Sequence, residues 1–252
     1  MLKVRLIPAL LLKEGRCIKT KKFENPRDTG DPIAASKVYD AQGADELLFL
    51  DITASHQRRD IFFDIIRKVA DECFMPLTVG GGVRSIEDIR TLLKIGADKV
   101  AVCTAFVENP DFVNKASKTF GVSTIVGIIT YGNIDGEKKV FTHGKETKTN
   151  LDVLSWAKEL EDRGAGEIFL YSIDRDGVMS GYDTDLVDKV NKNISVPLIV
   201  CGGAGKLSDF VDVVKQTNVS AVSAGSIFHF TDQNLIKTRC HMKNEGLNVR
   251  SL

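Results

Sequence analysis

The sequence predicts a single (β/α)8 barrel, and three observations lead to this fold class. The chain has 252 residues, a length that α/β barrels commonly fill as one domain, here 1–252. Short apolar segments alternate with amphipathic ones, which is the order expected of parallel strands and the helices that cover them. Motifs of the first half also recur in the second at an offset of about 121 residues. We therefore expect two duplicated half-barrels, about 1–120 and 121–252.

Eight apolar runs supply the expected strands. Each is too short for a helix and too continuous for a strand with one face in water, which is typical of parallel strands buried on both faces. In the first run, Arg5 and Pro8 interrupt what would otherwise resemble a signal peptide, so we interpret it as a buried strand. The runs are Val4–Leu10, Leu47–Ile52, Leu77–Val79, Lys99–Cys103, Thr124–Ile129, Ile168–Tyr171, Leu198–Cys201 and Ala221–Ala224.

Amphipathic segments between these runs supply the expected helices, and Gly43, Gly96 and Gly164 follow three helix ends as left-handed caps. Two longer segments, 13–31 and 131–150, are expected to be irregular loops at the carboxyl ends of strands, where barrels place their active sites. The helices are expected at Asp60–Glu72, Ile86–Ile95, Pro110–Phe120, Leu151–Arg163, Asp185–Asn193 and Leu207–Gln216.

Charge and composition exclude several classes of function. Lys plus Arg and Asp plus Glu each total 34, so the net charge is zero and neither nucleic acid nor an anionic membrane is an expected partner. The five cysteines lack metal-ligand spacing and favour reduced thiols in a cytoplasmic protein. The histidines (His56, His143, His229 and His241) show no metal spacing either, and His229 is interpreted as structural. No metal or cofactor is expected.

Two glycine-rich loops, 80–82 and 202–205, each end a strand and open a helix. Glycine lets backbone amides approach an anion, and a helix start adds partial positive charge. We expect one phosphate at the second loop and another at the first, and thus an elongated bisphosphate ligand; tight turns without a ligand remain the alternative. The phosphate-binding residues expected from these loops are Gly82 with Thr104 in the first half, and Gly202, Gly203, Gly225 and Ser226 in the second.

Three aspartates also follow strands at this end of the barrel. Asp51 follows the second strand, and Asp174 and Asp176 follow the sixth. Carboxylates at such positions can serve as acid, base or hydroxyl-binding groups, or they can hold loops through hydrogen bonds to nearby amides.

Nine motifs are distributed along nearly the whole chain: Phe23-Glu24-Asn25, Gly30-Asp31-Pro32, Phe49–Ser55, Val79–Gly82, Gly96–Val100, Ser172–Gly177, Ser180–Tyr182, Gly202–Lys206 and Phe228–Phe230. Together they closely resemble the cyclase subunit of imidazole glycerol phosphate synthase. That family uses ammonia from a glutaminase partner to cleave and cyclise a bisphosphorylated ribulosyl intermediate of histidine biosynthesis. The resemblance implies a phosphate contact at Gly177 and a substrate-covering role for Lys19.

The chain departs from this family at its catalytic positions. The family's general acid and base are two aspartates, and the matching positions here are Leu11 and Thr130. Neither side chain can shuttle a proton near neutral pH, and each such group typically contributes a factor of about 10² to 10⁴ to the rate. Cys103 also replaces the asparagine usual beside the first phosphate loop. Loss of both carboxylates should nearly silence cyclisation.

A second cluster matches the family's salt-bridged gate for ammonia. Arg5, Glu46, Lys99 and Glu167 begin four of the expected strands, so their side chains can converge at the amino end of the barrel as a neutral ring. Asp98 matches a position that docks the glutaminase. An ion network that closes the barrel without a transport role is the alternative.

The leading hypothesis is therefore a non-cyclising relative that accepts ammonia from a glutaminase and passes it to another acceptor. Relatives with leucines after the first-strand proline, here Leu10-Leu11-Leu12-Lys13, resemble proteins of surface-polysaccharide clusters. Those proteins assist a sugar amidotransferase that turns an acetamido group into an acetamidino group. Two alternatives stay open: a true cyclase that recruits other groups such as the three aspartates, and a non-catalytic module that binds a phosphorylated ligand.

Overall fold

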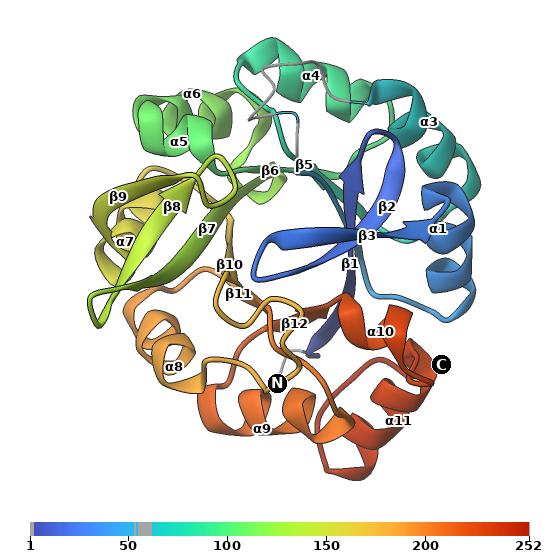
Figure 1. The fold of residues 1–252 in the computed structure, drawn as a ribbon. Coiled ribbons are helices and arrows are strands. Elements are labelled where there is room, and N and C mark those ends of the chain that lie inside the picture. Colours follow the sequence, from blue (N-terminus) through green and yellow to red (C-terminus); the bar gives the residue numbers. More distant parts are fainter. Residues whose placement is uncertain (1–2, 53, 55–61, 252) are drawn as a thin grey trace.

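The computed structural model describes residues 3–52, 54 and 62–251 and shows a closed barrel of eight parallel strands (Figure 1). Consecutive barrel strands pair in parallel around the ring, and β12 pairs with β1 to close it. The barrel strands are β1 (Arg5–Lys13), β4 (Leu47–Asp51), β5 (Leu77–Gly80), β6 (Lys99–Val102), β7 (Ile125–Ile134), β10 (Glu167–Ser172), β11 (Leu198–Cys201) and β12 (Ala221–Ala224). All eight expected strands are confirmed.

Helices surround the barrel on its outside (Figure 1). The expected helices are confirmed within a few residues at each end, except that residues 60 and 61 lie outside the described part of the chain. The helices are α1 (Pro32–Ala41), α3 (Phe63–Glu72), α4 (Ile86–Lys94), α5 (Thr104–Glu108), α6 (Asp111–Phe120), α7 (Val153–Asp162), α8 (Thr184–Asn193), α9 (Leu207–Thr217), α10 (Ser226–Phe230) and α11 (Leu235–Asn244), with a 3-10 turn at Val122–Thr124. The three glycine caps have positive φ, as expected.

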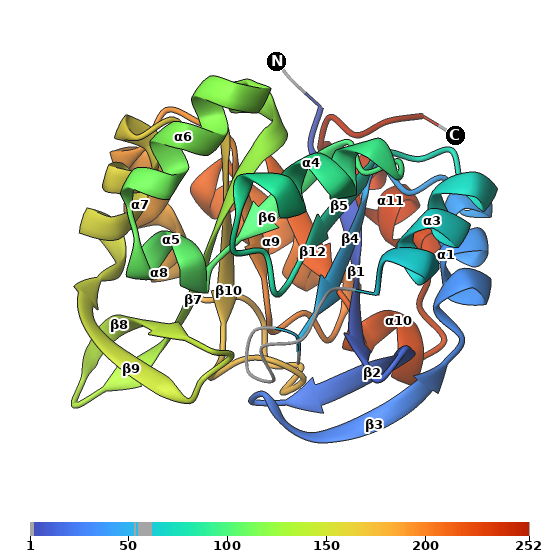
Figure 2. The same cartoon turned by 90° about the horizontal axis from the view of Figure 1, so that it is seen from above.

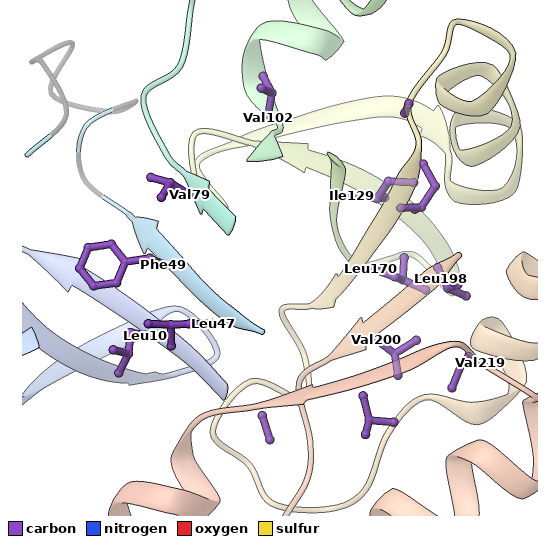
Figure 3. Packing of buried hydrophobic residues seen from close by; sticks show 14 of the residues in the cluster. Leu10, Leu47, Phe49, Val79, Val102, Ile129, Leu170, Leu198, Val200 and Val219 are labelled. Carbon is purple, nitrogen blue, oxygen red and sulfur yellow. The ribbon is translucent and has the colours of Figure 1, made fainter. Parts of the chain in front are cut away.

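The main core lies between the strands and these helices. Alternate side chains of each strand belong to a cluster of buried residues that also includes residues of the helices. Figure 3 shows Leu10, Phe49 and Val79 from this cluster on their strands. Other apolar side chains of the strands form a second, separate cluster inside the barrel. Burial on both faces accounts for the continuous apolar runs in the sequence. None of the helices in the described residues has the length and apolar character needed to cross a bilayer.

The two segments expected to be irregular are antiparallel hairpins, so that expectation is wrong. After β1, the strands β2 (Arg16–Lys21) and β3 (Glu24–Gly30) fold back over the barrel, and after β7 the strands β8 (Glu137–Thr142) and β9 (Thr147–Asp152) do the same. Each hairpin extends a barrel strand through a two-residue turn, Glu14-Gly15 or Asp135-Gly136, in which both φ angles are positive. Such turns match the twist of paired strands. Figure 2 shows both hairpins at one end of the barrel and the chain termini at the other.

Candidate functional site

A cavity of about 640 Å³ opens at the carboxyl end of the barrel, beneath the two hairpins. Its floor comes from the ends of barrel strands, and its walls come from the loops after β5 and β6. Hairpin residues complete it, among them Phe23 and Pro26 from one hairpin and the 143–146 turn from the other. The cavity therefore occupies the end of the barrel at which the sequence places the active site.

Leu11 and Thr130, the two positions at which the resembled cyclases carry aspartates, line this cavity together. Leu11 is 2% exposed and belongs to the apolar cluster inside the barrel, with Ile18 and Leu50. Thr130 lies beside Cys103, whose Sγ is 3.8 Å from the threonine Oγ1. Burial raises the pKa of the Cys103 thiol, so the thiol stays protonated near neutral pH. This part of the cavity holds no carboxylate on the two matching strands.

The two glycine loops have matching geometry in the two halves. Gly81 and Gly202 have φ angles of 95° and 97°, and a Cβ added at either one would collide with the backbone of the preceding barrel strand, at Asp51 or Ser172. Only glycine fits such a close approach of two backbones. In both halves the next helix also begins alike, because Asp88 accepts hydrogen bonds from the amides of residues 84 and 85, and Asp209 from those of residues 205 and 206.

The structure divides the seven phosphate-binding positions expected from the sequence into two groups. Gly82 and Thr104 line the large cavity, where the Thr104 hydroxyl accepts a 3.1 Å hydrogen bond from the His143 amide. The other five line a separate pocket of only about 20 Å³ in the second half: Gly177, Gly202, Gly203, Gly225 and Ser226. The two groups therefore do not share one open site.

Lys19 accounts for the small size of the second pocket. Its side chain reaches from β2 into the pocket, is 3% exposed, and donates a short hydrogen bond to the Ala9 carbonyl. A Cβ at Gly225 would overlap the lysine Nζ. Burial lowers the pKa of Lys19 to about 8, because the ammonium loses its water. The residue that the resemblance assigns to covering substrate is thus packed into a glycine loop of its own chain.

Asp174 and Asp176 hold the two hairpins. The Asp176 carboxylate is buried and accepts hydrogen bonds from the Thr20 hydroxyl at 2.6 Å, the Tyr171 hydroxyl at 2.9 Å and the Phe23 amide at 3.2 Å. Burial raises its pKa. Asp174 accepts a 2.9 Å bond from the Asn133 amide, at the base of the other hairpin. These contacts match the loop-holding alternative for both aspartates.

Asp51 lies at the end of β4, is 3% exposed and lines the large cavity. One of its carboxylate oxygens accepts a 3.1 Å hydrogen bond from the Ala54 amide. Of the three aspartates considered from the sequence, it is the one that lines the large cavity.

The four charged residues at the amino end of the barrel form a closed ring of alternating charge. Arg5 pairs with Glu46 at 2.9 Å and with Glu167 at 3.0 Å, and Lys99 pairs with the same two glutamates at 2.9 and 3.0 Å. Glu46 also accepts a 2.5 Å hydrogen bond from the Thr78 hydroxyl. Each charge thus has two partners of opposite sign, which offsets the cost of removing these charges from water.

An apolar interior joins this ring to the cavity. The cluster inside the barrel includes Ile7, Leu48, Val126, Phe169 and Ile199 nearer the ring, all at most 2% exposed. Its members at the other end line the cavity as well: Leu11, Leu50, Ala101, Ile128 and Tyr171. A small neutral molecule crossing this interior would lose less solvation energy than an ion.

Asp98, the position matched to glutaminase docking, is exposed at the amino end of the barrel. One of its oxygens accepts a 2.8 Å hydrogen bond from the Leu77 amide at the start of β5. Asp98 is therefore an exposed residue that also has a local structural role.

Several contacts in this region were not predicted from the sequence. Tyr171 and Phe23 form an edge-to-face pair with ring centroids 4.8 Å apart between the two pockets. Glu24 pairs with Lys145, which joins the tips of the two hairpins. Phe23 lies within a motif and Tyr171 within an expected strand, whereas no local signal in the sequence marks a contact between two hairpin tips.

His229 bonds to the Tyr39 hydroxyl at 3.1 Å, and burial lowers the pKa of His229 to about 3, so the imidazole is neutral.

Comparison with known protein families shows that residues 5–234 match the family described as histidine biosynthesis protein. The matched range begins at the first residue of β1 and extends past α10. It includes every barrel strand, both glycine loops, the four-residue ring and the cavity.

Proposed function

This chain belongs to the histidine biosynthesis protein family, and from that premise we propose that it is a non-cyclising subunit that conducts ammonia. A glutaminase would deliver the ammonia at the amino end of the barrel, and an acceptor would receive it at the carboxyl end. The observation that carries this proposal is the complete ring of Arg5, Glu46, Lys99 and Glu167 at one end, combined with Leu11 and Thr130 in place of catalytic carboxylates at the other.

The chain lacks the two catalytic carboxylates but has the complete ion ring, and this combination supports conduction of ammonia over cyclisation. The ring buries two carboxylates and costs stability if one member is lost, yet all four members are present. The apolar interior between ring and cavity suits ammonia as the neutral molecule, since an ammonium ion would have to leave its water behind. For the acceptor we propose a sugar whose acetamido group becomes an acetamidino group, with a separate amidotransferase that activates it.

A tracer experiment tests ammonia conduction. The chain is combined with its glutaminase and the sugar amidotransferase, and glutamine labelled with ¹⁵N at the amide is supplied in the presence of excess unlabelled ammonium. Conduction through the barrel predicts that the sugar product carries ¹⁵N despite the unlabelled pool. A product that carries the unlabelled isotope, or no nitrogen transfer at all, would contradict the proposal.

Docking of the glutaminase is tested with a matched pair of variants. Asp98→Asn keeps an oxygen for the Leu77 amide and removes the charge, and should weaken binding of the glutaminase by about tenfold, as loss of one charged contact predicts. Asp152→Asn is the control, because Asp152 caps α7 at the opposite end of the barrel and asparagine caps equally well. Equal affinities for both variants would contradict docking at Asp98.

A further inference from the structure

The two halves of the barrel build equivalent glycine loops, but only one of them faces open space. The first-half loop borders the cavity of about 640 Å³, whereas the second-half pocket retains about 20 Å³. A volume of that size is close to the minimum needed for one water molecule. A phosphate group therefore does not fit the second pocket alongside the Lys19 side chain.

We propose that Lys19 is a built-in plug of the second phosphate pocket, and that this chain consequently takes a ligand with a single phosphate, bound in the first-half cavity. This departs from the elongated bisphosphate that the doubled glycine loops suggest. The proposal concerns ligand binding alone and holds whether or not the barrel conducts ammonia.

The plug is held by contacts of the residues that follow Lys19 in the chain. The neighbouring Thr20 hydroxyl bonds to Asp176 at 2.6 Å, and the Lys22 amide bonds to the Asp176 carbonyl at 2.8 Å. A Cβ at Gly177 would collide with the Thr20 carbonyl, so the hairpin packs directly onto the loop after β10. These contacts fix β2 over the pocket, and they hold Lys19 in it.

Both the ammonium group and the methylene stem of Lys19 make contacts inside the pocket. The ammonium group donates to the Ala9 carbonyl, which belongs to the barrel strand, and its methylene stem fills the space beside Gly225. The stem alone excludes a phosphate from this space, so the block does not depend on the charge of the ammonium.

The open cavity suits one phosphate joined to an apolar or planar body. Gly82 and Thr104 lie at its rim, while Leu11, Leu50 and Ile128 form an apolar floor. Aspartates at positions 11 and 130 would have given the floor two more negative charges; leucine and threonine leave these two positions uncharged. The ligand that we infer is a monophosphorylated compound whose uncharged part rests on this floor.

Titration with inorganic phosphate, followed through backbone amide resonances, tests the proposal site by site. In the natural chain we expect phosphate to shift the Gly82 and Thr104 amides and to leave Gly202, Gly203 and Gly225 unmoved. In Lys19→Ala, all five amides should shift, and the phosphate concentration for half-saturation at Gly203 should fall by at least about tenfold.

Lys19→Met separates volume from charge, because methionine keeps most of the length of the stem without the ammonium. The second-half amides should stay unmoved in this variant. Shifts at Gly203 in the natural chain at the concentration that saturates Gly82 would overturn the plug, and that measurement needs no variant. A Lys19→Ala chain that retains a dispersed amide spectrum but gains no shift at Gly203 would also overturn it. Absence of shifts at Gly82 in every chain would overturn the single-phosphate site.

Discussion

Cys103 Sγ lies 3.8 Å from Thr130 Oγ1, at the ends of two neighbouring barrel strands. The resembled cyclases carry an asparagine and an aspartate at these positions, so a charged, hydrogen-bonding pair has become a neutral one. Burial keeps the thiol protonated by raising its pKa. Neither group can accept a proton from a substrate near neutral pH.

Restoring the two aspartates should not restore a cyclase. In the Leu11→Asp, Thr130→Asp double variant we expect no imidazole glycerol phosphate to form from the ribulosyl bisphosphate intermediate and ammonium, because Lys19 still fills the second phosphate pocket. The measurement is a cyclase assay at high ammonium concentration. Addition of Lys19→Ala to the double variant is the informative comparison, and activity in the double variant alone would contradict the expectation.

The ion ring should behave as one unit in a double-mutant cycle. Lys99→Met leaves two buried glutamates with a single cation and should lower the free energy of unfolding by up to about 3 kcal/mol. Lys99→Met with Glu167→Gln removes one charge of each sign and should cost less than the sum of the two single changes. Denaturant unfolding of the four chains gives the coupling, and strictly additive costs would show that the charges act independently.

Lys19 predicts a rise in stability at alkaline pH. Its pKa is lowered by burial from 10.5 to about 8, so between these values the unfolded chain binds a proton that the folded chain lacks. The free energy of unfolding should therefore increase across this range, by about 3 kcal/mol when complete, and the increase should be absent below pH 8. Unfolding of the natural chain and of Lys19→Met, measured from pH 7 to 10, checks this. A pH dependence that is the same in both chains would show that other groups cause it.

Asp176 should control the opening of the first hairpin. Asp176→Ala removes the acceptor for the Thr20 hydroxyl and the Phe23 amide, so amides of residues 16–30 should exchange with deuterium at least about tenfold faster. Asp174→Ala is the control, because its partner Asn133 belongs to the second hairpin. Mass spectrometry of peptides from both hairpins measures the effect, and equal exchange of residues 16–30 in the two variants would contradict it.

The barrel could be predicted from the sequence because its strands are buried on both faces, and their sequences are therefore continuous apolar runs. The hairpins were missed even though Asp135-Gly136 is a strong hairpin-turn signal. Their strands are short and partly exposed, so the apolar alternation that reveals a strand is weak in segments such as Glu24–Gly30, where five of seven residues are exposed.

The candidate site divides in the same way. The glycine loops and the four-residue ring have residue types that follow from local geometry and charge balance, and the structure brings each group together. The burial of Lys19 could not be predicted from the sequence, because a lysine in a loop is ordinarily solvated. Its burial depends on the first hairpin, which is held in place by Asp176, a residue 157 positions further along the chain. Contacts between residues so far apart in the chain leave no pattern in the local sequence.

Glu24 and Lys145 join the tips of the two hairpins, and they are 121 residues apart, the same separation that relates the two halves of the barrel. They are therefore counterparts, and their contact lies where a twofold axis between the halves would pass. In an assembly of two identical half-barrels, a residue on such an axis meets its own copy, and equal charges would repel. Here an acid faces a base, which is possible because the two halves of this chain carry different residues at the matching positions. The contact is therefore attractive where two identical charged residues would repel each other.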